Sequence, residues 1–181
     1  KDLEETSWAS DSAGWFWKHG KSVDLSSYAA KNDLIYISQK INGAYNGFND
    51  RKSLFQRGYK ALLVDNCQNS SMCWDIENFT LPTSAAFAEA APSFAWGLWH
   101  DSTSTKSGVT KSDALALEGY SRFLELEVAS PRPPKFKKKG KAMVQVADGR
   151  FGYKYWQDMV KHAQERVNAL SSATPSNGAG E

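Results

Sequence analysis

The sequence lacks the features that mark several large classes of protein. No apolar run approaches the ~18 residues that a membrane span requires, and residues 1–5 do not have the character of a signal peptide. With 22 Lys and Arg against 20 Asp and Glu, the net charge is only +2, so no overall field attracts the chain to nucleic acid or to an anionic membrane. The first residue is not Met, and we expect the sequence to be a mature or excised piece whose true start lies upstream.

Common catalytic and metal-binding motifs are also absent. The chain contains no Gly-rich phosphate loop, no nucleophile elbow and no pair of His or Cys residues at a spacing that suits a metal ion. His19, His100 and His162 stand alone, and a lone His is usually a surface residue or a satisfied core residue. Basic and aromatic residues alternate too sparsely in "KFKKKGK" for a nucleic-acid module. We therefore expect no cofactor, no metal and no nucleic-acid partner.

The two cysteines, Cys67 and Cys73, are six positions apart. In an oxidising compartment they can close a small disulfide loop, whereas in a reducing compartment they remain free thiols. The sequence leaves both states open.

The chain does contain enough apolar material for a core, because 41% of its 181 residues are hydrophobic and seven are Trp. Over the first 65 residues, apolar periodicity predicts three helices. The first ends at Gly20, the second begins at Asn32 or Asp33 and ends at Gly43, and the third is capped by Asp50. The apolar stripe of the third comprises Leu54, Phe55, Tyr59, Leu62 and Leu63.

The middle of the chain is less regular. A short helix is predicted between Pro82 and Pro92, and periodicity does not assign the aromatic stretch "SFAWGLWH" that follows. A long helix is predicted to begin at Ser112 and to end before Pro131. Its predicted apolar face comprises Ala114, Leu117, Leu124 and Val128, with Tyr120 and Phe123 adjoining.

The last third begins with "PRPPKFKKKGK", residues 131–141, which is predicted to be a stiff basic connector. Alternating residues around Asp148-Gly149 predict a β-hairpin with its turn at that dipeptide. A final amphipathic helix follows, and residues 171–181 are predicted to be a disordered tail. The apolar face of the final helix comprises Trp156, Met159, Val160, Ala163, Val167 and Leu170.

The segment "INGAYNGFNDR", from Ile41 to Arg51, forms a polar elbow between the second and third predicted helices. Sugar hydroxyls donate and accept hydrogen bonds, as Asn side chains do, and Trp faces cover the C–H faces of a sugar ring. Alternatively, Asn42, Asn46 and Asn49 only shape a turn, which Asn does without any ligand. Composition alone favours the turn.

The elbow and the preceding helices together resemble a segment of family 19 glycoside hydrolases, the lysozyme-like chitinases and related endolysins. In that family a Trp-rich helix, a helix ending in Ile-Asn-Gly, an Asn-Gly and an Asp-Arg leading a third helix follow at the same spacing. The matching residues are Trp15-Phe16-Trp17, Ile41-Asn42-Gly43, Asn46-Gly47, Asp50-Arg51, Phe55 and Tyr59. Ala44 departs from the family, which usually has a second Gly there, and the resemblance covers roughly residues 1–64.

The resemblance implies roles for these residues. Asn42 corresponds to an Asn that contacts substrate, and Arg51 corresponds to an Arg that couples electrostatically to the catalytic acid. We place Gly43, Asn46 and Trp17 in the same substrate-binding set. Such enzymes use two widely separated carboxylates, one protonating the leaving oxygen and one activating water, which inverts the anomeric centre.

The family's two carboxylates lie upstream of the matched segment, so no catalytic residue is assigned in this chain. Glu4 and Glu5 lie near the boundary but do not align with the acid, and a Glu at a helix start commonly serves only the helix dipole. Nothing in the spacing of the other candidates marks a pair; these are Asp75, Glu77, Asp101, Glu118, Glu125 and Glu127. Either the other half of a hydrolase lies outside this chain, or its C-terminal two thirds supplies new carboxylates.

We therefore expect a mainly α fold: the C-terminal portion of a lysozyme-like domain, an additional helical region, and a small C-terminal β-hairpin plus helix. The expected regions are a family-19-like segment (1–66), a mainly helical region (67–130), the basic connector (131–141), the hairpin and helix (142–170) and the tail (171–181). The expected function is hydrolysis of β-1,4 linkages in peptidoglycan or a chitin-like polymer, in a protein that is secreted or delivered to the bacterial periplasm as an endolysin or toxin effector.

Three kinds of partner follow from these expectations: the glycan, an upstream domain that carries the catalytic Glu, and an immunity protein. The alternative function is a noncatalytic module that binds peptidoglycan or a partner. A third class is a structural piece that completes a hydrolase by docking against an upstream domain, and it would expose a large apolar face.

Overall fold

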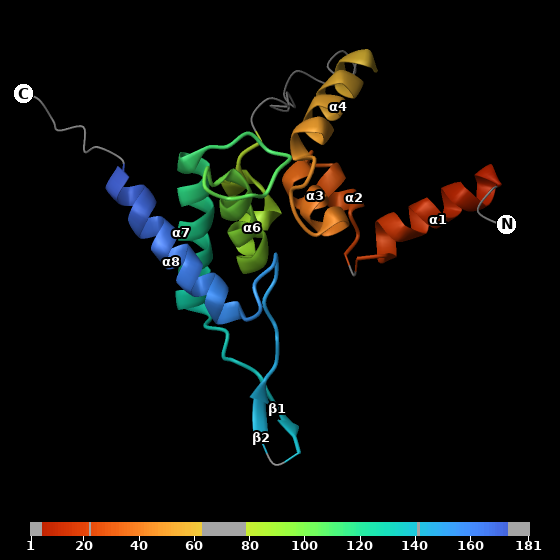
Figure 1. Cartoon of the computed structure of the whole chain (residues 1–181). Helices are drawn as coiled ribbons and strands as arrows, with labels where there is room; N and C mark the ends of the chain where they lie inside the picture. The colour runs from red at the N-terminus through yellow and green to blue at the C-terminus, as the bar shows by residue number, and fades with distance from the viewer. Residues whose placement is uncertain (1–4, 22, 63–78, 141, 174–181) are drawn as a thin grey trace, which may run out of the picture.

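The computed structural model describes residues 5–21, 23–62, 79–140 and 142–173, and every structural statement below refers to these residues. The fold is mainly helical with one small antiparallel hairpin before a C-terminal helix, which confirms the predicted class (Figure 1). The α-helices are α1 (Thr6–His19), α2 (Ser26–Ala29), α3 (Leu34–Asn42), α4 (Phe48–Ala61), α6 (Ala90–His100), α7 (Asp113–Ala129) and α8 (Trp156–Ala173). Two 3-10 helices, η3 (Leu81–Thr83) and η4 (Ala85–Ala88), precede α6, and the strands are β1 (Phe136–Lys139) and β2 (Ala142–Gln145). None of the described helices is long and apolar enough to cross a membrane.

The caps of the N-terminal helices follow local chemistry. The Asp33 side chain accepts a hydrogen bond from the Tyr36 amide at 3.0 Å and starts α3, and Gly43, with φ of 75°, ends it, as predicted. The predicted cap of α4 was wrong. Its N-cap is Gly47, with φ of 65°, and Asp50 lies inside the first turn.

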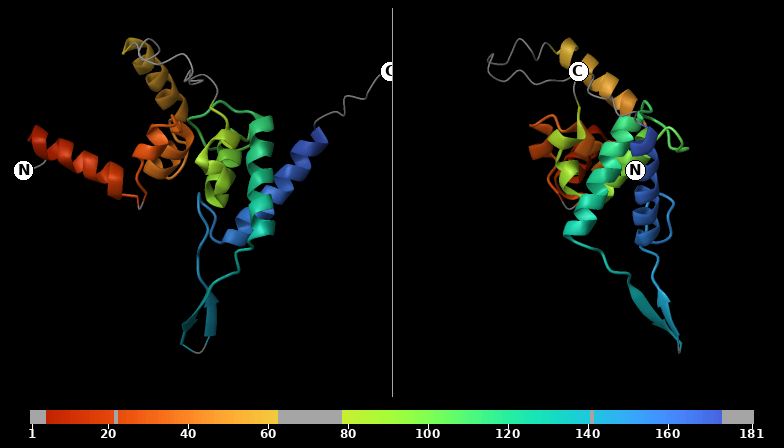
Figure 2. Two further views of the ribbon diagram at one scale, coloured as in Figure 1. Left: turned by 180° about the vertical axis from the view of Figure 1, so that it is seen from behind. Right: turned by 90° about the vertical axis from the view of Figure 1, so that its left-hand side faces the viewer.

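The core is built around α6, in which every residue after the first two is buried. It lies directly against α7, and the two helices are closest at Gly97 and Gly119. They approach so closely there that a Cβ added to Gly119 would collide with the backbone of Gly97. Trp156, Met159 and Ala163 of α8 join the same hydrophobic core, so that α6, α7 and α8 form a three-helix body (Figures 1 and 2).

The N-terminal helices share this core. Tyr45 and Phe48 pack edge-to-face against Trp96 of α6, with ring centroids 5.2 and 6.0 Å apart. Asp33 also accepts hydrogen bonds from the Ser84 hydroxyl at 2.7 Å and the Ala85 amide at 2.8 Å. One hydrophobic cluster therefore contains residues from both sides of position 66.

The hairpin does not lie where the sequence predicted it. Strand β1 pairs with β2 in the register Phe136↔Gln145 to Lys139↔Ala142, and Gly140, with φ of 64°, follows β1. The end of the predicted connector is thus the first strand, and the hairpin projects from the helical body (Figure 1). Asp148 does not form the predicted turn. Its carboxylate accepts a hydrogen bond at 3.0 Å from the Trp156 amide, one of the amides at the start of α8 that have no partner within the helix.

Other boundaries also differ from the predictions. The predicted short helix is η3 and η4, and the unassigned aromatic stretch belongs to α6, which holds Pro92 in its first turn. The predicted face of α7 was partly right: Leu117 and Leu124 pack against the core, and the adjoining Tyr120 and Phe123 are buried in it. The centre of the buried face lies at Gly119, and Ala114 and Val128 at the edges of the predicted face are exposed, Val128 to 82%. The buried residues of α7 are Ala116, Gly119, Tyr120 and Phe123. Helix α8 extends to Ala173, into the predicted tail, while Cys67, Cys73 and residues 174–181 lie outside the described residues.

Candidate functional site

The elbow is shaped by two glycines in the left-handed conformation. Gly43 has φ of 75° and Gly47 has φ of 65°, a region that side-chain-bearing residues rarely adopt. Ala44, where the resembling family usually has Gly, has no positive φ and is 4% exposed. The local backbone therefore does not require Gly at position 44.

Two of the three elbow asparagines attach the elbow to the rest of the protein. Asn46 Oδ1 accepts a hydrogen bond from Trp99 Nε1 at 3.2 Å. Asn49 donates from Nδ2 to Thr110 Oγ1 at 3.0 Å. The side chain of Asn42 is exposed and makes no hydrogen bond within the described residues. Among the described residues, Asn42 is thus the elbow asparagine whose whole amide group is available to an external ligand, whereas Asn46 and Asn49 each use one amide atom within the protein.

Arg51 lies beside the same turn. Its Nε donates to the buried Ser38 hydroxyl at 3.0 Å, and a Cβ added to Gly47 would lie 3.6 Å from its Nη1. Its Nη2 is buried and has no hydrogen-bond partner in the part of the chain that the structure describes. Burial lowers the pKa of Arg51, and the nearby charge of Asp50 opposes that shift. The guanidinium is therefore anchored at one nitrogen and unsatisfied at another.

Trp17, the fifth predicted site residue, lies apart from the other four. It is half-buried near the end of α1, where its carbonyl accepts a hydrogen bond from the Leu25 amide at 3.2 Å. Helix α1 extends away from the helical body (Figures 1 and 2). The structure thus gathers Asn42, Gly43, Asn46 and Arg51 in the elbow and leaves Trp17 outside it.

Helix α1 has an unusual surface, because none of its described residues is buried. Trp8 is 58% exposed, Trp15 63% and Phe16 39%. Large aromatic side chains clustered in this way mark surfaces that another molecule or another part of a protein covers.

The carboxylates considered from sequence do not gather at the elbow. Glu5 is exposed before α1, Glu125 pairs with Arg122 at 2.9 Å, and Glu127 accepts a hydrogen bond from an amide just beyond α7. None of these described carboxylates hydrogen-bonds to Arg51. Glu4, Asp75 and Glu77 lie outside the described residues.

Glu118 has the most distinctive environment among the described candidates for a catalytic acid. It is half-buried on α7, its Oε2 has no hydrogen-bond partner among the described residues, and burial raises its pKa, which the Trp96 side chain partly offsets. A carboxyl that holds its proton more tightly suits a general acid. Its interaction is nevertheless with a core residue of α6 and not with Asn42 or Arg51.

The three histidines occupy different environments. His19 is exposed beside Trp15, with ring centroids 5.8 Å apart. His100 is buried, and its Nδ1 lies 2.9 Å from the Trp96 carbonyl oxygen. His162 belongs to a polar network on α8, which sequence reasoning missed.

That network is centred on Asp101, which is 1% exposed. Asp101 accepts hydrogen bonds from Arg166 Nε at 2.7 Å and Nη2 at 3.1 Å, from the Thr103 amide at 2.8 Å, and from Tyr120 Oη at 3.2 Å. Tyr120 Oη also lies 3.2 Å from His162 Nε2. Burial alone would raise the pKa of Asp101, but the Arg166 and Thr103 hydrogen bonds prevail and lower it. The one sequence signal was the spacing of His162 and Arg166, which places both on one face of a helix.

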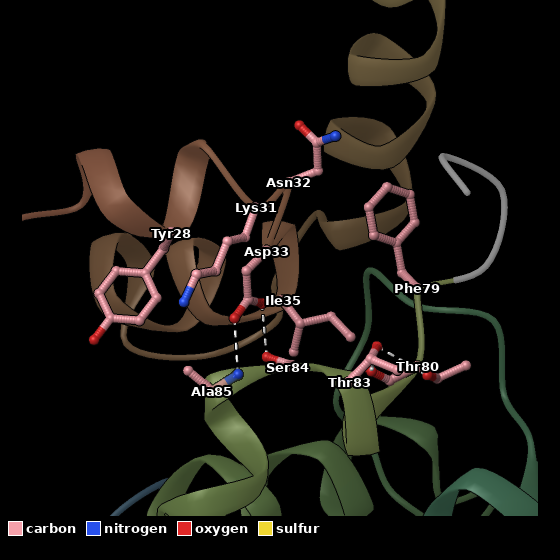
Figure 3. Close-up of a pocket in the computed structure, with 10 residues that line it drawn as sticks. All are labelled: Tyr28, Lys31, Asn32, Asp33, Ile35, Phe79, Thr80, Thr83, Ser84 and Ala85. Atoms are coloured by element: carbon pink, nitrogen blue, oxygen red, sulfur yellow. Dashed lines mark hydrogen bonds between the residues drawn. The ribbon is translucent and has the colours of Figure 1, made fainter. Parts of the chain in front are cut away.

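A pocket with a volume of about 650 Å³ lies beside the start of α3 (Figure 3). Asp33 points across it toward Ser84 and Ala85, and its carboxylate is already occupied by their hydrogen bonds (Figure 3). Asn32 adopts φ of 54°, and Lys31 and Tyr28 complete that side. None of the residues Asn42, Gly43, Asn46 and Arg51 lines this pocket or two other pockets of the described chain.

Comparison of the chain with protein-family models, with curated proteins and with solved structures finds no match.

Proposed function

We propose that this chain forms the C-terminal part of the catalytic domain of a glycoside hydrolase of the lysozyme and chitinase type. Its substrate is a β-1,4-linked amino-sugar polymer, with peptidoglycan favoured over chitin by analogy with endolysins and cell-wall effectors. The elbow forms one wall of the glycan cleft, where Asn42 contacts a sugar and Arg51 orients the catalytic acid. The acid and base lie on an upstream region, and the protein acts at the bacterial cell wall after secretion or delivery to the periplasm.

The unsatisfied Nη2 of Arg51 carries this proposal. A guanidinium presents donors in a rigid fork that matches a carboxylate, and here only Nε has a hydrogen-bond partner among the described residues, Ser38. A buried donor without a partner costs about 1–3 kcal/mol, so a carboxylate brought to Nη2 removes a cost that the described residues leave in place.

The exposed face of α1 supports the same proposal. Trp8 and Trp15 are more than half exposed, and Phe16 is 39% exposed although Lys21 Nζ lies 5.6 Å from its ring centroid. A region that carries the catalytic acid would cover this face in the complete domain and bring its carboxylates toward the elbow.

A second candidate function is a noncatalytic module that binds peptidoglycan or a protein partner such as an immunity protein. Among the described residues, the carboxylate whose charge acts on Arg51 is the exposed Asp50, and it forms no hydrogen bond with the guanidinium. A binding module needs the Asn42 surface but no acid.

Kinetics of elbow variants in the complete gene product test the proposal. Arg51→Ala removes a charge-assisted contact to the acid, so we expect the loss of about 2–4 kcal/mol of transition-state stabilisation and a turnover about 30- to 1000-fold lower. Asn42→Ala removes a sugar contact that is also made in the ground state, so it should raise KM more than Arg51→Ala does. Release of reducing ends from purified peptidoglycan and from chitin oligomers gives both constants.

Asn49→Ala is the matched control, because this elbow amide is occupied by Thr110. It should lower the melting temperature slightly and leave kcat and KM unchanged. Unchanged turnover in a stably folded Arg51→Ala protein would refute the assigned role of Arg51. Saturable binding of peptidoglycan with no turnover by the complete product would favour the noncatalytic module.

A further inference from the structure

A second pocket, of about 330 Å³, lies between the loop that follows α6 and the turn that precedes α8. Its volume is within the range of small-molecule sites and suits a ligand of about one sugar ring. Hydroxyl groups and aromatic rings share its lining; they belong to Thr103, Ser104, Thr105, Phe151, Tyr153 and His162.

The donors around Asp101 fix the direction of each hydrogen bond in the network. Both carboxylate oxygens accept from Arg166, and Thr103 donates to Oδ1 from its amide at 2.8 Å and its hydroxyl at 2.7 Å. A carboxylate surrounded by these donors is ionised and can only accept. Tyr120 therefore uses its single hydroxyl proton on Asp101 Oδ2, at 3.2 Å.

The direction of the Tyr120 hydrogen bond in turn assigns the tautomer of His162. Because the Tyr120 hydroxyl proton is used, Tyr120 Oη can only accept from His162 Nε2, 3.2 Å away. Burial lowers the pKa of His162, although the Asp101 charge opposes this, so the ring is neutral near pH 7. A neutral ring protonated at Nε2 has a lone pair on Nδ1, and Nδ1 makes no hydrogen bond within the described residues.

Packing holds the His162 ring in place. The ring centroid lies 5.3 Å from that of Tyr153, 5.6 Å from that of Tyr120 and 6.1 Å from that of Phe94. An acceptor whose tautomer and ring orientation are both fixed costs little additional ordering when a ligand binds.

The other wall of the pocket has a strained backbone. Phe151 adopts φ of 60°, which is uncommon for a bulky residue, and Gly152 follows with φ of 105°. Hydrogen bonds from the Gly149 amide to the Lys154 carbonyl, at 3.1 Å, and within the turn hold this conformation. Backbone strain of this kind is concentrated at ligand sites.

We propose that this pocket binds a neutral, hydroxylated ligand of about one sugar ring, which donates a hydroxyl hydrogen bond to His162 Nδ1. The aromatic side chains of Phe151 and Tyr153 in the lining suit the apolar side of such a ring. Asp101 adds no net charge to the pocket because Arg166 balances it. The Lys106 ammonium, which also lines the pocket, already lies 5.2 Å from the centroid of the Trp99 ring and can donate to a ligand hydroxyl. The site is separate from the elbow and does not depend on hydrolysis.

The tautomer is tested first, by long-range ¹H–¹⁵N NMR of the uniformly labelled chain above pH 7. We expect the His162 ring to show a protonated Nε2 and an unprotonated Nδ1. A ring protonated at Nδ1 would overturn the proposal, because no acceptor would then face the ligand. This measurement needs no substitution and is independent of the folding of any variant.

Ligand binding is tested by titrating the chain with N-acetylglucosamine while observing the rings of His162 and Tyr153. We expect saturable shifts of both rings, and about tenfold weaker binding by His162→Phe, which removes one hydrogen bond. His19→Phe is the matched control and should bind as the wild type does. Arg51→Ala should also leave this titration unchanged. The titration therefore tests the pocket independently of the role proposed for Arg51 in the elbow.

Two results of the titration contradict the proposal. One is the absence of a saturable shift at His162 in the folded wild type. The other is undiminished binding by a folded His162→Phe protein.

Discussion

Asp101→Asn replaces a buried carboxylate by an amide of nearly the same shape, and we expect it to destabilise the helical body strongly. Asp101 accepts hydrogen bonds from Arg166, Thr103 and Tyr120, and these residues belong to α8, to the loop after α6, and to α7. An amide has a single oxygen, so its NH₂ group would face donors that now have no acceptor. The substitution therefore weakens the polar contact between three elements at once.

The magnitude follows from burial. Removing one partner of a buried ion pair costs about 3–5 kcal/mol. Because the Arg166 side chain is 19% exposed and can regain some hydration, we expect the lower end, about 3 kcal/mol. In a chain of this size, that loss lowers the melting temperature by about 6–12 °C.

Glu89→Gln is the matched control. Glu89 accepts from Tyr36 and Lys40, but its side chain is 39% exposed, so we expect a loss of no more than about 1 kcal/mol.

Urea unfolding followed by circular dichroism measures both losses, and a double-mutant cycle with Arg166→Met isolates the pair. The pH dependence gives a second check. The pKa of Asp101 is lowered below its ordinary 3.8 in the folded protein, so its stabilisation is present above pH 3.8 and is lost as the pH falls through the folded value. The difference between wild type and Asp101→Asn should therefore narrow in acid. Equal losses for Asp101→Asn and Glu89→Gln at neutral pH would show that burial does not make the Asp101 contacts stronger than the exposed Glu89 contacts.

Two further predictions concern single positions. Gly108→Ala places a Cβ against the Gly47 backbone, at a residue with φ of 96°, so it should separate the elbow from the loop that contains Gly108 and lower the melting temperature. Gly14→Ala is the control: its Cβ would enter open space on α1, so it should be neutral or stabilising by up to about 1 kcal/mol. Burial lowers the pKa of His100 to about 4, so stability should fall as the pH drops from 6.5 toward 4; an NMR titration midpoint near 6.5 would contradict this.

The parts of the fold that the sequence predicted well depend on neighbours along the chain. Asp33 and Ser112 cap helices because a short polar side chain meets an amide three residues later, at 3.0 Å and 3.4 Å. Gly43 ends α3 because only a residue without Cβ adopts its conformation cheaply. The apolar face of α8 was also predicted correctly, since a strong 3.6-residue period indicates the buried side without knowledge of the partner.

The parts that were predicted wrongly depend on contacts distant in sequence. The edges of the buried face of α7 were predicted wrongly, because Gly119 packs against Gly97 and leaves Ala114 and Val128 exposed, which no property of α7 alone indicates. Asp148-Gly149 has the composition of a hairpin turn, but the Trp156 amide uses the Asp148 carboxylate at the start of α8. The Asp101 network likewise joins residues up to 65 positions apart, so the spacing of His162 and Arg166 indicates a shared helix face but not its partner Asp101.

The elbow combines residues that the fold needs with residues that it does not. Gly43 and Gly47 make the turn, and Asn46 attaches it to α6, so their presence follows from folding alone. Asn42 has no such explanation within the described residues, and Arg51 uses one nitrogen on Ser38 while leaving Nη2 buried without a partner. A fold gains nothing from an unsatisfied buried donor, so the polar groups in excess of structural need are the ones to test for glycan recognition.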